Sequence, residues 1–397
     1  MTDFAATKAM FHIPDGMIYL DGNSLGPLPK AAPARVAKAM TEEWGEMLIT
    51  GWNKAGWMAK ATEVGDRVAK LIGAEAGHVV MGDTLSIKVY QALASALELR
   101  PERRVILSDS GNFPSDLYMA EGLIKSLGQG HELRIVAPEE VEENITEDVA
   151  VTLITEVDYR TGRLHDMKAL TAKAHSVGAL TIWDLAHTAG ATDVKLSECK
   201  ADFAVGCTYK YLNGGPGAPA FIYVAPRHAE KVRPALSGWL GHEAPFAFDL
   251  SYRAGAGIER MRVGTPPILA LASLEAALDA WETVDMRDLR TRSQELTHLF
   301  LEEVERRCPM LTLASPRDTA ARGSQISFSF EHGYAAMQAL IARGVIGDFR
   351  APNVMRFGFT PLFIDKADVL RACDVIEEVM TGKLWDKPEY HARAAVT

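Results

Sequence analysis

One short segment of the sequence reads Cys207-Thr208-Tyr209-Lys210-Tyr211-Leu212-Asn213-Gly214-Gly215-Pro216-Gly217. The apolar runs on its two sides, 202–206 and 219–224, have the length and composition of buried strands. The segment is therefore predicted to be a loop that carries Lys210 between two strands. Most loop lysines are solvated cations, but an amine that is withdrawn from water has a lowered pKa and becomes a nucleophile.

A second segment, one strand upstream, supplies a partner for this lysine. An apolar strand over 179–183 ends at Asp184, and His187 follows three residues later. An enzyme that uses pyridoxal 5'-phosphate (PLP) needs a lysine for the Schiff base and a carboxylate that keeps the pyridine nitrogen protonated. Neither residue is specific alone, but their order and spacing predict PLP as the cofactor.

The composition excludes several classes of protein. The chain has 397 residues, 48% hydrophobic and 24% charged, which are the proportions of a globular protein with two or three domains. A net charge of -10 argues against a nucleic-acid or anionic-membrane partner. The four cysteines, Cys199, Cys207, Cys308 and Cys373, form no CxxC pair, so neither a metal site nor a disulfide framework is expected. Since no signal peptide or membrane span is recognisable, we expect a cytoplasmic protein.

Strand and helix patterns alternate from residue 104 onward, which is typical of an α/β fold. The expected strands are continuous apolar runs, as in a parallel sheet covered by helices. They lie at 105–107, 133–136, 149–154, 180–182, 203–205 and 220–223. Helices are expected at about 29–49, 58–72, 115–127 and 167–177. The first of these would place Val36, Met40, Trp44 and Met47 on one apolar stripe.

Beyond Pro267 the pattern becomes that of a smaller α+β unit. Helices at 268–282 and 286–307 lead to a strand at 325–330 in which polar and apolar residues alternate. A helix at 334–342, strands at 345–349 and 354–359, and a helix at 366–380 follow. We therefore predict an N-terminal segment (1–45) associated with the small domain, a PLP-binding large domain (46–266) and a C-terminal small domain (267–397).

Polar residues follow several predicted strands at the edge where ligands of a parallel sheet collect. Thr155 and Asp184 lie there, as does the run 112–116. A helix is predicted to begin near Thr84, where free N–H groups suit a phosphate. The alternative is that Thr84 only caps its own helix. Asp83 is an awkward neighbour for a phosphate unless its backbone N–H does the binding.

Six motifs together make the chain similar to the kynureninases, PLP enzymes of fold type I in the class V aminotransferase superfamily. They are the segments 19–26, 112–116, 184–187, 209–213, 238–243 and 262–269. The lysine and aspartate motifs are shared across the superfamily, whereas the NSLG, FPSD and GWxGHE motifs single out kynureninases. The resemblance covers nearly the whole chain. It implies a type I fold, with a large domain built on a mostly parallel sheet and a smaller α+β C-terminal domain.

The resemblance also implies an activity, the hydrolysis of L-kynurenine or 3-hydroxy-L-kynurenine to anthranilate or its 3-hydroxy form and L-alanine, in tryptophan catabolism. Lys210 and Tyr209 would be catalytic. The implied cofactor contacts are Asp83, Thr84, Phe113, Pro114, Ser115, Asp116, Thr155, Asp184, His187, Tyr209, Lys210, Trp239 and Thr265. Trp239 and Thr265 would reach the phosphate of a neighbouring subunit, which implies a homodimer. Position 265 is threonine where some family members have asparagine.

Ser24 and Arg356 are the residues implied to contact the substrate. Arg356 lies in an apolar strand, where a guanidinium without a partner would be strongly unfavourable. A substrate carboxylate would satisfy it with two hydrogen bonds. An internal Asp or Glu would do so equally well, so both interpretations stay open at this point.

Two other functions are compatible with parts of the sequence. Another class V enzyme, an aminotransferase or a cysteine desulfurase, would share the cofactor contacts. A desulfurase needs a reactive cysteine on a mobile loop, whereas Cys308 and Cys373 fall in or at the end of predicted helices. A catalytically inactive relative would be expected to lack the lysine or the aspartate, and the sequence has both.

Overall fold

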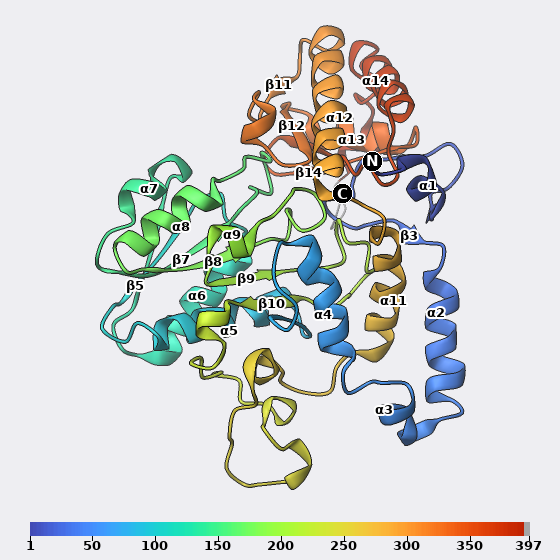
Figure 1. Ribbon diagram of the computed structural model, residues 1–397. Helices are drawn as coiled ribbons and strands as arrows, with labels where there is room; N and C mark the ends of the chain where they lie inside the picture. Colours follow the sequence, from blue (N-terminus) through green and yellow to red (C-terminus); the bar gives the residue numbers. More distant parts are fainter. Residues whose placement is uncertain (393–397) are drawn as a thin grey trace.

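The computed structural model describes residues 1–392, and its centre is a seven-stranded sheet (Figure 1). The strands in order are β4 (Val79–Met81), β10 (Phe221–Val224), β9 (Phe203–Gly206), β8 (Leu180–Asp184), β7 (Val149–Thr155), β5 (Val105–Asp109) and β6 (Glu132–Val136). The pairs from β9 to β6 are parallel, and β10 runs antiparallel to both of its neighbours. The predicted sheet, mostly parallel, is confirmed.

Helices cover this sheet because its central strands are largely apolar and need cover on both faces. Strands β7, β8 and β9 are buried at every residue. The helices that pack on the sheet or on one another beside it are α4 (Lys60–Leu71), α5 (Leu85–Glu98), α6 (Pro114–Leu127), α8 (Met167–Ser176) and α11 (Ile268–Leu278). Shorter elements in this part are α3 (Gly51–Lys54), η3 (Pro138–Glu140), α7 (Val141–Asn144), α9 (Leu196–Cys199) and α10 (Pro226–Ala229).

A second, four-stranded antiparallel sheet lies at the top of Figure 1. Its order is β11 (Thr312–Leu313), β12 (Gln325–Ser329), β15 (Val354–Gly358) and β14 (Asp348–Arg350). The helices around it are α12 (Met286–Arg307), α13 (Gly333–Ile341) and α14 (Lys366–Thr381), with η7 (Asp279–Trp281), η8 (Thr319–Ala321) and α15 (Pro388–His391) nearby in the chain. Phe300 packs against Phe328, Phe357 and Phe359 in its core.

The alternation expected in strand 325–330 is not reflected in its burial. Gln325 to Phe328 are all buried, polar residues included. Gln325 and Ser327 are buried because they donate hydrogen bonds to the carbonyl of Arg160 in the large sheet's loops, at 3.1 and 2.6 Å. This strand therefore joins the two sheets instead of turning a polar face to water.

The first thirty residues lie against the C-terminal elements. Strand β2 (Ile18–Tyr19) pairs in parallel with β13 (Val345–Ile346), and β1 (Phe11–His12) pairs with β3 (Leu28–Pro29). From helix α1 (Phe4–Ala9), Lys8 forms an ion pair with Asp365 at 2.7 Å. The domain boundary predicted at residue 266 stays a prediction. Helix α11, which follows this residue, packs against α4 beside the large sheet, whereas the next long helix, α12, packs against the four-stranded sheet.

The helix expected over 29–49 is wrong as a single element. Helix α2 (Ala32–Lys38) passes into a π-helix, η1 (Ala39–Trp44), and then a 3₁₀ turn, η2 (Leu48–Thr50). The predicted apolar stripe is not buried, since Met40 is 47% and Trp44 57% exposed. An apolar pattern predicts a contact but not whether the partner belongs to the same chain.

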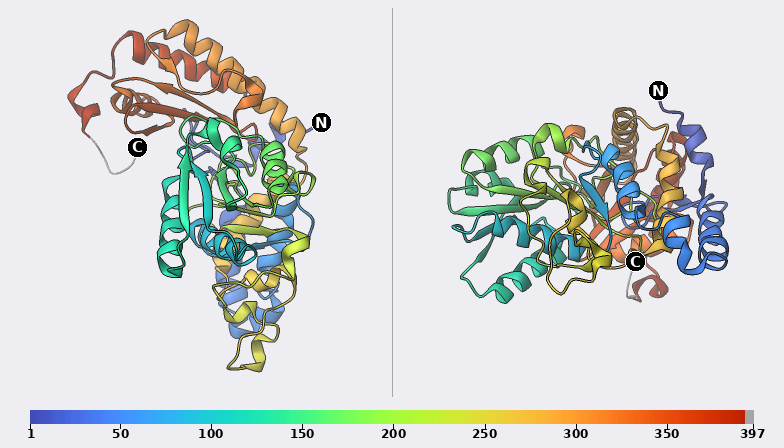
Figure 2. Two further views of the ribbon diagram at one scale, coloured as in Figure 1. Left: turned by 90° about the vertical axis from the view of Figure 1, so that its left-hand side faces the viewer. Right: turned by 60° about the horizontal axis from the view of Figure 1, so that its bottom comes forward.

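A loop over 238–256 projects from the end of the molecule opposite the four-stranded sheet (Figure 2, left). It contains η4 (Trp239–Gly241) and η5 (Pro245–Ala247) and leads into η6 (Gly257–Met261). Phe246, Phe248 and Leu250 are exposed on it. Among residues 1–392, no helix has both the length and the apolar character to cross a membrane.

Candidate active site

Lys210 lies on the loop after β9 and contacts a histidine. Its Nζ donates a hydrogen bond to Nε2 of His187 at 3.0 Å and lies 6.0 Å from the centre of the Phe113 ring. Burial, and then the charge of Lys210, lower the pKa of His187 well below its ordinary value. The imidazole is therefore neutral. Because the Lys210 ammonium is a donor, Nε2 of His187 is the acceptor and carries no proton.

Two buried carboxyl groups, Asp184 and Asp116, lie beside the lysine. Asp184 ends β8, and its oxygens accept the N–H of Ala186 at 2.8 Å and the hydroxyl of Thr155 at 3.3 Å. Burial raises the pKa of Asp184, while Lys210 and these hydrogen bonds oppose the shift. Burial and the charge of Asp184 raise the pKa of Asp116 well above its ordinary value. Asp116 therefore keeps its proton, and Asp184 is the better carrier of negative charge.

Tyr209 precedes the lysine and is half-buried. The neighbouring Cys207 side chain, and then burial, raise the pKa of the Tyr209 phenol above its ordinary value. The phenol is therefore protonated at neutral pH and is able to donate a proton. Its ring centre lies 5.7 Å from the Lys210 Nζ, so the two catalytic residues predicted from the sequence are adjacent.

Two helices begin at this site. Phe113 is the N-cap of α6 and Pro114 its first residue, and the Phe113 ring lies edge-on to Tyr159 with centres 5.2 Å apart. In the first turn of α6, the Ser115 hydroxyl is 3.0 Å from that of Ser86 in the first turn of α5. The N-termini of α5 and α6 therefore converge, which concentrates free N–H groups and the positive ends of two helix dipoles.

The loop before α5 has an unusual backbone. Thr84 is the N-cap of α5, but its side chain makes no capping hydrogen bond, so the alternative that it only caps its helix is not realised. Asp83 has a φ of +55°, in the left-handed region that few residues other than glycine adopt. Thr265 lines a small cleft together with Asp83.

Arg356 has an internal carboxylate partner, one of the two possibilities left open by the sequence. Strand register places Asp348 opposite it, and the Arg356 Nε donates to Asp348 at 2.6 Å. Arg356 also donates to Ser24 at 3.0 Å, which brings the two predicted substrate residues together. A second guanidinium, that of Arg350, lies 2.8 Å from Asp348.

This cluster keeps a positive charge. Burial, and then the charge of Asp348, raise the pKa of Asp21 to about 8, so that Asp21 is protonated at neutral pH. Two arginines then share the one charged carboxylate of Asp348. The sequence predicted no role for Asp348, Arg350 or Asp21. The position of Asp348 inside an apolar run is nevertheless a signal, because a carboxylate buried there needs a partner.

The N-terminal segment covers the lysine loop. The N–H of Gly26 donates to the carbonyl of Tyr209 at 2.8 Å. A Cβ at position 26 would lie 2.4 Å from the carbonyl oxygen of Lys210, so the NSLG motif needs its glycine here. Two residues earlier in the same segment, the Ser24 hydroxyl donates to Asp348 at 2.6 Å.

Trp239 lies apart from this cluster. It is 41% exposed on the projecting loop, where its ring lies edge-on to Phe246 with centres 5.9 Å apart. Within residues 1–392, no hydrogen bond or ring contact joins Trp239 to Lys210. A role for Trp239 at the site of another subunit stays a prediction.

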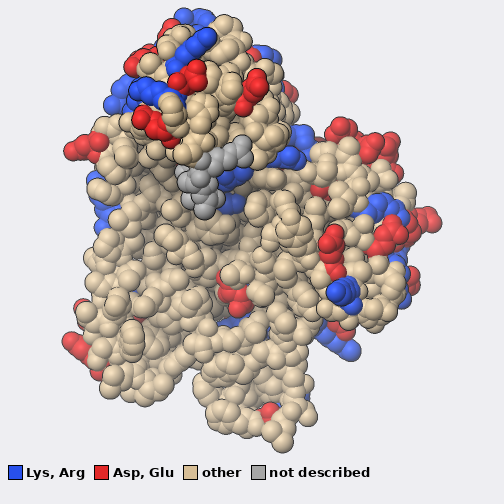
Figure 3. Space-filling model, turned by 180° about the vertical axis from the view of Figure 1, so that it is seen from behind, with Lys and Arg blue, Asp and Glu red and all other residues tan. Residues whose placement is uncertain are grey.

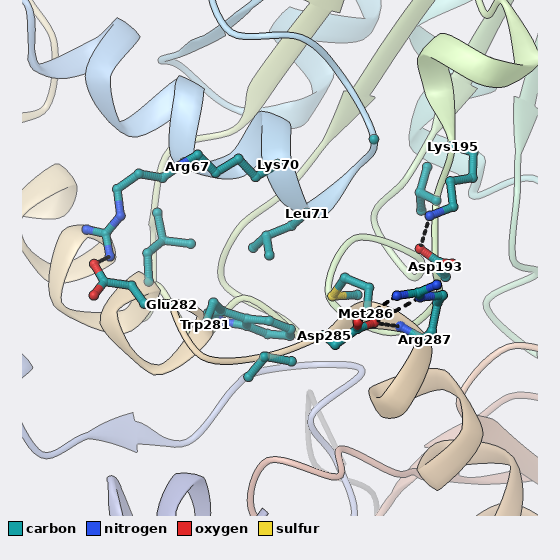
Figure 4. A pocket seen from close by; sticks show the side chains of 14 residues that line it. Arg67, Lys70, Leu71, Asp193, Lys195, Trp281, Glu282, Asp285, Met286 and Arg287 are labelled. Carbon is teal, nitrogen blue, oxygen red and sulfur yellow. Dashed lines mark hydrogen bonds and ion pairs between the residues drawn. The ribbon is translucent and has the colours of Figure 1, made fainter. Parts of the chain in front are cut away.

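A cavity of about 730 Å³ lies elsewhere, between the end of α4 and the connection from α11 to α12 (Figure 4). Several of its charged side chains pair with one another, as Lys195 does with Asp193 at 2.7 Å and Arg287 with Asp285 at 3.0 Å. None of the residues predicted to contact cofactor or substrate lines it. The candidate active site is therefore the lysine cluster and not this cavity.

Comparison with known proteins gives the family. A protein named kynureninase from Pseudomonas fluorescens is 50% identical over 400 residues, which cover 99% of this chain and 96% of that one. The chain belongs to the kynureninase family. A kynureninase from Burkholderia pseudomallei (strain 1106a) is 48% identical with the same coverage. A family model described as the kynureninase C-terminal domain matches residues 289–376.

Comparison with solved structures supports fold type I for this chain, as expected. A cysteine desulfurase from Thermococcus onnurineus NA1 superposes with a TM-score of 0.80 at 19% identity, covering 95% of this chain and 98% of that one. A C-DES variant with glycine covalently linked to its PLP cofactor also gives 0.80, at 13% identity, over 95% of this chain and all of that one. At these identities the likeness concerns the fold alone.

The cysteines of the chain do not suit a desulfurase. Burial raises the pKa of Cys308 to about 11 and that of Cys373 to about 12. A nucleophilic thiol needs the opposite, a lowered pKa and access to substrate. The kynureninase relatives and these buried thiols together disfavour the desulfurase alternative.

Proposed function

We propose that the protein is a PLP-dependent hydrolase that cleaves L-kynurenine, or 3-hydroxy-L-kynurenine, to anthranilate or its 3-hydroxy form and L-alanine. The observation that carries this proposal is the 50% identity to a kynureninase over 99% of the chain. The contact of Lys210 with His187, beside the buried Asp184, supports it.

The residues at the site fit PLP. Two buried polar atoms there, Oδ2 of Asp116 and Nδ1 of His187, have no partner among the described residues. The amine of Lys210 suits the aldehyde, the Asp184 carboxylate suits the pyridine nitrogen, and the exposed Phe113 ring suits stacking. The converging N-termini of α5 and α6 suit the phosphate.

When bound, PLP supplies an electron sink that stabilises negative charge on the substrate carbon. The Lys210 Nζ, the amine that would hold the cofactor aldehyde, would also be the group that accepts the α-proton. The Tyr209 phenol, which is protonated at neutral pH, donates a proton as water adds to the γ-carbonyl and the carbon–carbon bond breaks. The Asp184 carboxylate would hold the pyridine nitrogen protonated.

The arginine cluster suits the α-carboxylate of an amino acid. Two guanidiniums, Arg350 and Arg356, share Asp348, so the cluster has one uncompensated positive charge. Ser24 adds a hydroxyl at the same place. Binding the carboxylate here would orient the α-proton toward Lys210.

We also propose that the active unit is a cytoplasmic homodimer, with the division into domains predicted above. Figure 3 shows a broad face with few charged side chains over the lower half of the molecule. The large apolar side chains exposed on α2 to η2 and on the projecting loop are Met40, Trp44, Leu48, Ile49, Trp239, Phe246, Phe248 and Leu250. Exposed apolar side chains in such number support an interface. Sedimentation as a monomer at micromolar concentration would contradict it.

The purified protein is expected to be yellow and to release anthranilate from kynurenine without any added keto acid. Anthranilate fluorescence is the measurement, and a requirement for a keto acid would favour an aminotransferase instead. Lys210→Ala is expected to lose both the colour and the activity. The matched control is Lys200→Ala, a lysine at the end of α9 that has no role in this site.

A further inference from the structure

Lys88 is a buried lysine that the proposed mechanism does not use. It lies in the first turns of α5 and is only 1% exposed. Its Nζ donates to Gln91 Oε1 at 2.9 Å and to Asp83 Oδ2 at 3.1 Å, and the carbonyl of Met261 lies 3.5 Å away. Since burying an ammonium is strongly unfavourable without partners, this arrangement needs a reason beyond packing.

Asp83, the partner of Lys88, is bound on two sides. Its carbonyl accepts the N–H of Ala220 at 3.1 Å, and its side chain, which is 33% exposed, is held from the interior by Lys88. The backbone of Asp83 is left-handed, a conformation that persists only where the surroundings impose it. Lys88 is therefore one of the groups that fix the loop at the start of α5.

Lys88 also connects this loop to a second segment. Gln91 donates to the same Met261 carbonyl at 3.1 Å, so Lys88 and Gln91 together hold the chain just before Arg262. That chain continues to Thr265, which lines one cleft with Asp83 and Lys88. One buried ammonium therefore contacts both the loop predicted to meet the phosphate of its own subunit and the segment that leads to Thr265, which is predicted to meet the phosphate of the neighbouring subunit.

The charge of Asp83 poses a problem for that phosphate. A carboxylate beside the N-terminus of α5 repels a dianion that binds there. Lys88 attracts the carboxylate from the interior side and compensates its charge. Burial lowers the pKa of Lys88, while the charge of Asp83 and its hydrogen bond oppose the shift.

We propose that Lys88 is a positioning residue for the cofactor phosphate, acting through Asp83, whose carboxylate it turns inward and neutralises. This inference rests on the proposed function, because it takes PLP as the ligand. It assigns no direct contact between Lys88 and the phosphate. The backbone N–H groups and the Thr84 hydroxyl remain the groups that bind.

The test compares the affinity of the cofactor-free protein for PLP and for pyridoxal, which lacks the phosphate, by absorbance titration. Lys88→Met keeps the length of the side chain and removes its charge. We expect its dissociation constant for PLP to rise about 10- to 100-fold, the order seen when a charged group loses its partner. Its affinity for pyridoxal should change little.

A second substitution separates charge from structure. Asp83→Asn removes the carboxylate, so the Lys88→Met/Asp83→Asn double variant should regain most of the PLP affinity. Equal losses for PLP and pyridoxal would overturn the inference, as would a double variant no better than Lys88→Met. If Lys88→Met bound PLP as tightly as the wild type, the role of Lys88 would be refuted but the proposed function would stand. If the wild-type chain bound no PLP, the proposed function would be refuted as well.

Discussion

At the scale of single residues, the Tyr209 phenol offers the clearest test of proton transfer. Tyr209→Phe removes the proton and little else, so kcat should fall about 10²- to 10⁴-fold, the range for general acid–base catalysis. Steady-state turnover of kynurenine is the measurement. An unchanged kcat would show that another group supplies the proton.

The control for this variant is Tyr211→Phe. The Tyr211 hydroxyl is also buried, but it donates to the carbonyl of Ser324 at 3.1 Å and is not part of the proposed site. Its removal should reduce stability by about 1 kcal/mol, the usual contribution of one hydrogen bond, and leave kcat near the wild-type value.

Single residues also show how far the sequence predicts the site. Lys210, Asp184 and His187 could be predicted because each follows a strand, and the ends of parallel strands meet at one edge. The partner of Arg356 could not, because pairing with Asp348 depends on the register of two strands. A shift of one residue would have turned Asp348 to the other face.

At the scale of elements, Gly26 controls how the N-terminal segment meets the lysine loop. A Cβ at this position would lie 2.4 Å from the Lys210 carbonyl oxygen and from the Asn213 side chain. Gly26→Ala should therefore displace the loop and destabilise the protein by about 1–3 kcal/mol, the usual effect of overpacking. Urea denaturation measures the loss, and cofactor absorbance should change with it.

Gly122→Ala is the matched control for this substitution. Gly122 lies within α6, and a Cβ there would meet nothing within 4 Å. Alanine should stabilise the helix by about 0.5–1 kcal/mol because glycine loses more backbone entropy on folding. If both variants were equally destabilised, the close approach at Gly26 would not be the cause.

The bounds of helices and strands are what the sequence patterns predicted most accurately. The long helix 286–307 and the buried strands were predicted nearly to their ends, because a continuous apolar run or a 3.6-residue period is a local signal. The failures have a common cause. The stripe on 29–49 and the polar residues of β12 depend on what packs against them, which no local pattern contains.

At the scale of the whole molecule, Glu156 makes stability depend on pH. It follows β7 in the large sheet, and the charge of Arg290 on α12 attracts it. Burial raises the pKa of Glu156 to about 8. In the unfolded chain a glutamate titrates near pH 4.3, about its ordinary value.

The sign follows from where the proton is held. Below about pH 4, Glu156 is protonated in both the folded and the unfolded chain. Between about pH 4 and pH 8 only the folded chain keeps the proton, so the free energy of unfolding falls as the pH rises. Glu156→Gln removes this dependence. Its unfolding free energy relative to wild type should increase by up to about 3 kcal/mol between pH 6 and pH 9, at about 1.4 kcal/mol per pKa unit. Chemical denaturation of both proteins at pH 6 and pH 9 measures this difference. An equal difference in unfolding free energy at the two pH values would contradict the raised pKa of Glu156.

The parallel pairing of β2 with β13 has a consequence for how the protein is made. Ile18 is synthesised long before its partner Val345. Contacts between such distant parts of a chain form slowly, because a long loop must close first. A nascent chain can therefore complete its central sheet well before the strand that leads into Ser24 and Gly26 is fixed, and the lysine loop acquires its N-terminal cover only after Val345 has emerged.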